Sequence, residues 1–332
     1  MTKKLILLSA LLLSLISVPA KATTCDRPYL LPAADQTKRT GTINVQVLFL
    51  KFPDSGKKSK GYTKDWINQL DLKEMNNYIK ETSYGKAKLK FNINYSWVNM
   101  PNNSYEYGVQ GMMSEQEENN YMNAIYNAAT DKIDFSKSDA VWVIPDPNTS
   151  PYYIAFRNPL VADGKKMMMV MYNETNAYLA VSEILHTLGL RDLYSYISFG
   201  PSGGMDQFSI MSQYYGGTSI LGYEKYSLGW LGGNDVICQE SGSRTVKLSS
   251  LDSKGTKLIL LPLNGQEMLG IEYRKKEKRD RYLGGSGILV YHINNQWNEN
   301  SPINPIYFGN KTNINYEGIN INIQKSTVTV TR

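Results

Sequence analysis

The segment SEILHTLGLRD, residues 182–192, places polar and charged side chains at regular intervals among apolar ones. The pattern over residues 175–190 is typical of a helix that ends at Gly189. Residues four apart share one face of a helix, so positions 182 and 186 point to the same spot, with Glu183 beside them. Because Gly189 permits a sharp turn, Asp192 can return to that spot. The segment therefore predicts a cluster of polar side chains at the end of a helix.

Zinc peptidases use this helix geometry to hold two histidine ligands and a glutamate that takes a proton from zinc-bound water. In this chain Ser182 stands where the first histidine belongs. A neutral hydroxyl is a poor zinc ligand, and the loss of one imidazole from a three-ligand site greatly weakens zinc binding. Because His186 and His292 are the only histidines among the 332 residues, a site built on three histidines is excluded.

Other segments surround this helix in a recognisable order, and together with it they resemble the secreted immune inhibitor A-type metalloproteases, a metzincin-like group. The family's helix pattern is His-Glu-x-x-His-x-x-Gly-x-x-Asp. The further matching segments are TSYGK (82–86) with the strand through residue 97, DLY (192–194), SIMS (209–212), YSLGW (226–230), IEYR (271–274) and GILVYH (287–292). The similarity spans about residues 41–295 in collinear order.

The resemblance implies an α+β fold with two parts. A metzincin-like zinc-peptidase domain, a mixed sheet plus helices, is expected over about residues 41–235, with its active-site helix at about 175–190. A β-rich C-terminal part is expected over residues 236–332, where helical periodicity gives way to short strands. Residues 23–40 are polar, contain two prolines and are expected to form an N-terminal lead-in.

The resemblance also assigns roles to the site residues. His186 and Asp192 would be zinc ligands, Glu183 the general base, and Met211 the methionine turn beneath the metal. Tyr214 or Tyr215 could substitute for the ligand missing at Ser182, since some metzincins use a tyrosine there. The cofactor expected is therefore zinc, bound weakly or not at all by the wild type.

Two simpler explanations of the same residues remain open. His186 and Glu183 can be structural residues of an amphipathic helix, retained without a metal. Ser182 and His186 could also form a serine-hydrolase dyad, but the sequence around them lacks a nucleophile elbow.

The N-terminus has the form of a secretory signal peptide. Lys3 and Lys4 precede a mostly apolar run, residues 5–18, and an Ala-x-Ala pattern ends at Ala22. The run is shorter than the ~20 residues of a membrane-spanning helix, so no integral membrane segment is expected. Residues 1–22 hold three lysines and no acid, which leaves the remainder a net charge of +3 instead of +6. We therefore expect a secreted protein with no nucleic-acid partner.

Cys25 and Cys238 are the only cysteines. In an oxidising compartment they could form a disulfide between the mature N-terminus and the middle of the chain. Two free buried thiols, or a lipid anchor on Cys25, are the alternatives.

Two functions follow as hypotheses. The chain is either an active secreted zinc endopeptidase with a substitute metal ligand, or a metalloprotease-like protein with impaired or lost hydrolysis. In the second case it would be a non-catalytic pseudoprotease that presents its cleft to a protein ligand. The expected partner is therefore a polypeptide, as substrate or as ligand.

Overall fold

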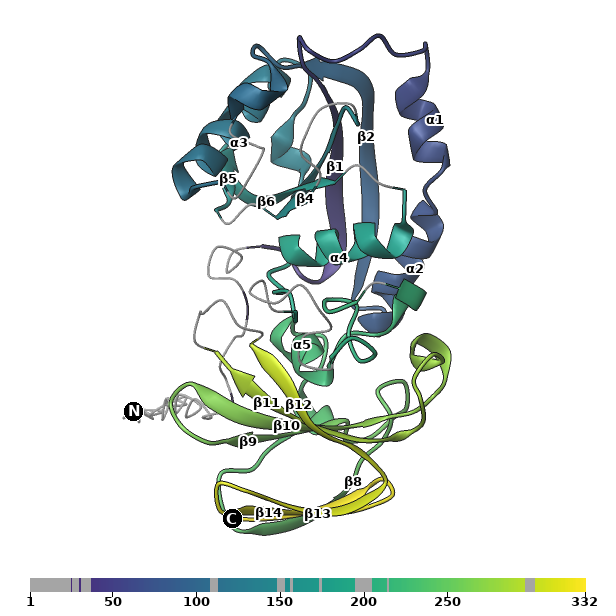
Figure 1. The fold of residues 1–332 in the computed structure, drawn as a ribbon, viewed down its shortest axis with the longest axis vertical. Helices are drawn as coiled ribbons and strands as arrows, with labels where there is room; N and C mark the ends of the chain where they lie inside the picture. The colour runs from purple at the N-terminus through teal and green to yellow at the C-terminus, as the bar shows by residue number, and fades with distance from the viewer. Residues whose placement is uncertain are drawn as a thin grey trace, which may run out of the picture.

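The chain folds into a mixed α+β structure, as the sequence predicts at the level of fold class (Figure 1). The computed structural model describes Cys25, Leu30 and residues 37–107, 113–147, 153–155, 158–172, 175–194, 205–213, 215–295 and 302–332. The expected signal peptide, residues 1–22, lies outside the described residues. Among the described residues, no helix is both long and apolar enough to cross a membrane.

The N-terminal half is built on a mixed sheet with the strand order β2-β1-β3-β6-β4. Its strands β1 (Gly41–Lys51), β2 (Ala87–Asn99), β3 (Ala140–Pro145) and β6 (Lys165–Tyr172) run parallel to their neighbours. Two short strands, β4 (Tyr153–Ala155) and β5 (Leu160–Ala162), pair with β6 in the antiparallel sense. The central strand β3 is buried along its whole length, because helices cover both faces of the sheet there.

The helices divide between the two faces of this sheet. The core on one face joins α1 (Tyr62–Asn68), α2 (Leu72–Thr82) and α4 (Ala177–Thr187) to the odd-numbered residues of β1. A second core, on the other face, joins α3 (Glu115–Ala129) to the even-numbered Leu48 and Leu50. The period-2 alternation of β1 thus decides which helix each side chain meets.

The C-terminal half begins with α5 (Gly222–Ser227) and continues as two stacked sheets. A five-stranded sheet has the order β12-β11-β10-β9-β7, and a four-stranded sheet has the order β13-β14-β15-β8. The bounds are β7 (Val236–Cys238), β8 (Ser243–Lys247), β9 (Leu258–Pro262), β10 (Glu267–Arg274), β11 (Gly287–Asn294), β12 (Ile303–Gly309), β13 (Lys311–Tyr316), β14 (Ile319–Gln324) and β15 (Thr327–Thr331). A third hydrophobic core lies between these sheets.

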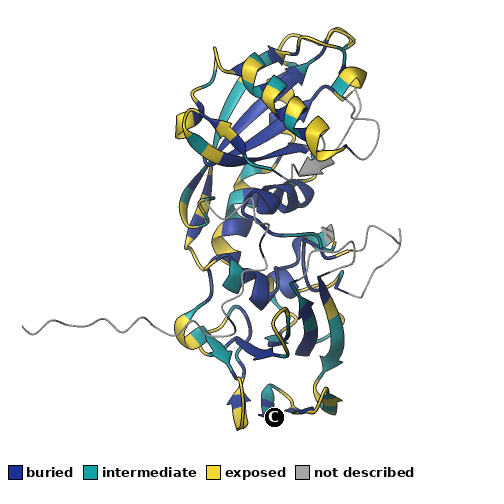
Figure 2. Cartoon of the chain, turned by 90° about the vertical axis from the view of Figure 1, so that its left-hand side faces the viewer, coloured by how far each residue is buried: buried dark blue, intermediate teal, exposed yellow. Residues whose placement is uncertain are grey.

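The two halves share one continuous core. The cluster that contains Leu185 of α4 also contains Met211, Leu260 of β9 and Leu289 of β11. Figure 2 shows this buried region extending from the sheet, through α4, into the C-terminal sheets. The helix that carries the predicted site therefore lies between the two halves and is supported by both.

A disulfide connects the beginning of the described chain to β7. Cys25 and Cys238 have their Cα atoms 5.9 Å apart, inside the range of about 4.4–6.8 Å that disulfides require. The bond closes a loop with a sequence separation of 213 residues. Cys25 is 1 % exposed and Cys238 is partly buried, so the linkage packs against the main hydrophobic core.

Replacing Cys238 by serine is expected to lower the free energy of unfolding by about 2–4 kcal/mol, because the unfolded chain regains the freedom that the crosslink removes. Denaturant unfolding of the variant and of the oxidised wild type measures the difference. Reduced wild type is the control and should unfold with the variant. A variant as stable as the oxidised protein would contradict a stabilising disulfide.

Candidate functional site

The site helix α4 is fixed at both ends by local hydrogen bonds. Asn176 caps its N-terminus, where the side-chain oxygen accepts the N–H groups of Tyr178 and Leu179. At its C-terminus Gly189 adopts a left-handed conformation with φ 104°. The N–H groups of Gly189 and Leu190 donate to the carbonyls of His186 and Leu185, which is the Schellman arrangement. The chain therefore reverses directly after the helix.

This reversal brings Asp192 back to His186. Asp192 Oδ1 lies 3.2 Å from His186 Nε2, and the His186 side chain is 8 % exposed. The other ring nitrogen, Nδ1, lies 2.8 Å from the carbonyl oxygen of Leu190, so it carries a proton and donates. A carboxylate at Nε2 then favours a second proton there. Although burial opposes the charge, Asp192, Glu183 and the Leu190 carbonyl raise the pKa of His186 to about 9.

Glu183 and Ser182 lie on the same buried part of the helix, at 9 % and 5 % exposure. Burial raises the pKa of Glu183 to about 7, with His186 opposing the rise and Asp192 adding to it. The Ser182 hydroxyl is not free toward His186 and Asp192. Its Oγ donates to the carbonyl oxygen of Leu179 at 2.7 Å, one turn earlier in α4.

Met211 lies in a segment that is hydrogen-bonded to the residues after the helix. Its side chain is buried, and its carbonyl accepts the N–H of Leu193, the neighbour of Asp192. Its own N–H donates to Ser209 Oγ, and Ser209 in turn donates to Glu224 Oε2 at 2.8 Å. Tyr214 and the side chain of Tyr215 lie outside the described residues.

The side chains of His186, Asp192 and Ser182 do not form a three-ligand metal site. His186 and Asp192 are together, but Ser182 is committed to a backbone carbonyl. Within the described parts of the chain, no group of three or more His, Cys, Asp or Glu side chains is placed to hold a metal ion. Catalytic zinc sites use three protein ligands and an open position, so the described residues do not fit a catalytic zinc ion.

Below the site lies a buried ionic cluster that the sequence analysis did not identify. Arg274 of β10 is completely buried and donates from Nε and Nη2 to both carboxylate oxygens of Asp280, at 2.7 and 2.6 Å. Its Nη1 donates to Glu272 and, at 2.7 Å, to the carbonyl of Phe208, three residues before Met211. The sequence held a signal for this cluster. Glu272 and Arg274, two apart in an apolar strand, must share the face that packs toward α5.

Glu224 of α5 belongs to the same cluster and bears one unsatisfied oxygen. Its Oε2 accepts the Leu221 N–H and the Ser209 hydroxyl, whereas Oε1 has no hydrogen-bond partner among the described residues. Burial raises the pKa of this carboxyl to about 7, with hydrogen bonds from Leu221 and Ser209 opposing the rise, Glu272 adding to it and Arg274 opposing it. The carboxyl is therefore neutral in the folded protein at mildly acidic pH.

Replacing Glu224 by glutamine is expected to remove a pH dependence of stability. The folded pKa is above the unfolded one, so folding is favoured while Glu224 stays protonated, and this contribution fades as pH rises from about 4.5 to about 7. The free energy of unfolding of Glu224→Gln, compared with that of the wild type at the same pH, should increase by up to about 3 kcal/mol as the pH rises from 5 to 8. Denaturant unfolding at both pH values measures it. Exposed Glu317→Gln is the control, and a pH-independent difference for Glu224→Gln would contradict the shift.

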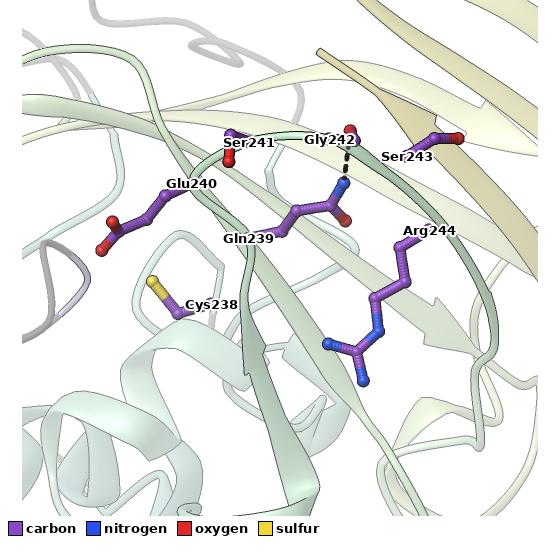
Figure 3. Close-up of a pocket in the computed structure, with 7 residues that line it drawn as sticks. All are labelled: Cys238, Gln239, Glu240, Ser241, Gly242, Ser243 and Arg244. Atoms are coloured by element: carbon purple, nitrogen blue, oxygen red, sulfur yellow. Dashed lines mark hydrogen bonds between the residues drawn. The ribbon is translucent and has the colours of Figure 1, made fainter.

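A pocket of about 530 Å³ lies away from α4, along the turn between β7 and β8 (Figure 3). It is lined by residues 238–244, and the Gln239 side chain reaches across it to the carbonyl of Gly242. Its charged side chains are Glu240 and Arg244, one of each sign, and they form no arrangement typical of catalysis.

Compared with models of protein families and with curated proteins, the chain matches none of them.

Proposed function

We propose that this chain is a secreted metalloprotease-like protein of the immune inhibitor A type whose zinc-dependent peptide hydrolysis is lost or impaired. Its function would be to bind a polypeptide in the region where related enzymes cleave one. The observation that carries this proposal is the direct contact between His186 Nε2 and Asp192 Oδ1, at 3.2 Å, beside a Ser182 hydroxyl that donates to Leu179. His186 and Asp192, which stand at two of the ligand positions of the family site, thus bind each other.

The rest of the site supports a derivation from a metal-binding ancestor. In metal sites a histidine ligand usually donates its other ring nitrogen to a backbone carbonyl, which orients the ligating nitrogen. His186 keeps that arrangement toward Leu190. A proton on Nε2 then supplies the positive charge that Asp192 needs, so the pair is stable without a third ligand.

Metal content and cleavage assays test the proposal. Purified wild type, dialysed against zinc, should hold clearly less than one zinc ion per chain by elemental analysis. Labelled casein should bind without being cleaved, and a chelator should change neither result. Stoichiometric zinc with chelator-sensitive cleavage would instead favour an active zinc endopeptidase. Tyr214→Phe and Tyr215→Phe would then identify the substitute ligand.

A further inference from the structure

The two faces of strand β1 differ in polarity along the amino-terminal half of the strand. On one face the odd-numbered positions 43–49 are all apolar and buried. On the other face Leu48 and Leu50 are apolar and pack under α3, but the preceding Asn44 and Gln46 are polar. The core around α3 includes neither of them. The amino-terminal half of this face is therefore polar, and it lies opposite to the face that α4 covers.

A hollow of about 680 Å³ lies over this polar surface. Asn44 and Gln46 of β1 line it together with Lys90 and Asn92 of the neighbouring β2, which pair with them in register. Gln46 is only 8 % exposed and donates to the carbonyl of Asn92. Residues 132–139, which follow α3 and lead into β3, supply another wall. The lining of the hollow thus includes one buried amide side chain, that of Gln46, and two partly buried ones, those of Asn44 and Asn92.

The charged side chains around the hollow are mostly lysines. Five lysines line it, namely Lys38, Lys90, Lys132, Lys137 and Lys165, against the two acids Asp134 and Asp139. The hollow therefore carries three surplus positive charges if all seven groups are ionised.

The two acids pair with three of the five lysines and leave the other two able to attract an anion. Asp139 is 7 % exposed and accepts from Lys165 at 2.9 Å, with Lys38 at 3.6 Å. Asp134 pairs with Lys137 at 2.8 Å. Neither acid contacts the remaining two lysines of the hollow. A recess lined by one sign of charge concentrates ligands of the opposite sign.

Those two lysines have no acidic partner among the described residues. Lys132 Nζ donates to the carbonyl of Trp97, which leaves its charge uncompensated. Lys90 is exposed and forms no ion pair within the described structure. Both are therefore suited to contact an anionic group.

The shape and chemistry of the hollow favour one class of anion. Among the described residues that line it, none is aromatic, so it offers no surface on which nucleobases could stack. Amides can both donate to and accept from hydroxyl groups, while lysines bind sulfate or carboxylate groups. A recessed site also suits a narrow chain better than a flat membrane surface. We propose that this hollow binds a short segment of an acidic glycan through its sulfate or carboxylate groups.

Binding of a heparin-derived hexasaccharide to the full mature chain tests this proposal. The double variant Lys90→Glu/Lys132→Glu should bind at least about tenfold more weakly, because two attractive charges become repulsive. The matched control Lys64→Glu/Lys73→Glu makes the same change in net charge on α1 and α2, at exposed positions on the opposite face of the sheet. It should bind within about twofold of the wild type. Thermal unfolding of both variants checks that they fold.

Three comparison ligands complete the test. A desulfated hexasaccharide should bind much more weakly, and inorganic sulfate should compete only when in large excess over the sugar-borne groups. An equal loss of binding in both double variants would overturn the proposal, because only overall charge would then matter. Equal affinity for a single-stranded oligonucleotide of the same charge would also overturn it.

Discussion

Replacing Arg274 by methionine is expected to lower the free energy of unfolding by about 3–5 kcal/mol, because it leaves Asp280 and Glu272 buried without their counterion. Arg274 is fully buried and makes hydrogen bonds to both carboxylates and to the Phe208 carbonyl. Methionine matches much of its volume but satisfies none of these groups. Denaturant unfolding, monitored by tryptophan fluorescence, measures the change.

The neighbouring Lys275 provides the matched control. It forms an ion pair with Glu277 at 2.7 Å, but its side chain is 51 % exposed. Lys275→Met should therefore change stability by less than about 1 kcal/mol, since exposed ion pairs contribute little. Similar losses for the two variants would contradict the burial argument. A stabilised Arg274→Met would show that desolvation of the cluster outweighs its internal attraction.

The elements of the N-terminal half could largely be predicted from periodicity. The β-branched, apolar run INVQVLFLKF corresponds to β1, and the alternation in KAKLKFNINYSW corresponds to β2. The helical pattern of residues 115–129 corresponds to α3. The spacing of apolar residues within each segment is enough to predict these elements, because each of them buries apolar side chains at regular intervals. The pairing of strands far apart in sequence, such as β8 with β15, depends on packing between sheets and leaves no local signal.

The same distinction applies to the site. The return of Asp192 to His186 was predictable, because one helix turn and a left-handed glycine determine it locally. The direction of the Ser182 hydroxyl was not, because a serine in a helix can donate either to a carbonyl of the preceding turn or to a group outside the helix. Only the folded structure shows that it donates to Leu179. The contact from Arg274 to Phe208, which joins residues 66 positions apart, was not predictable either.

Replacing Ser182 by histidine is expected to create a zinc site and to give the chain chelator-sensitive peptidase activity. Position 182 shares a helix face with His186, and Asp192 is already beside that histidine. A second imidazole would complete three protein ligands and leave the fourth position open to water. Zinc affinity should then rise by at least roughly an order of magnitude over the wild type, because even the loss of a group that only supports a ligand costs about 10–100-fold.

The activity of this variant should depend on Glu183. With its pKa raised to about 7, Glu183 can accept a proton near neutral pH, as a general base at this position must. Ser182→His/Glu183→Ala should therefore keep the gained zinc and lose the cleavage of casein. Ser182→Ala controls for the loss of the hydroxyl alone and should gain neither property. If Ser182→His binds no more zinc than Ser182→Ala, the helix no longer directs position 182 toward His186 and Asp192. The proposed loss of hydrolysis would then result from a changed position of the helix backbone and not from one missing ligand.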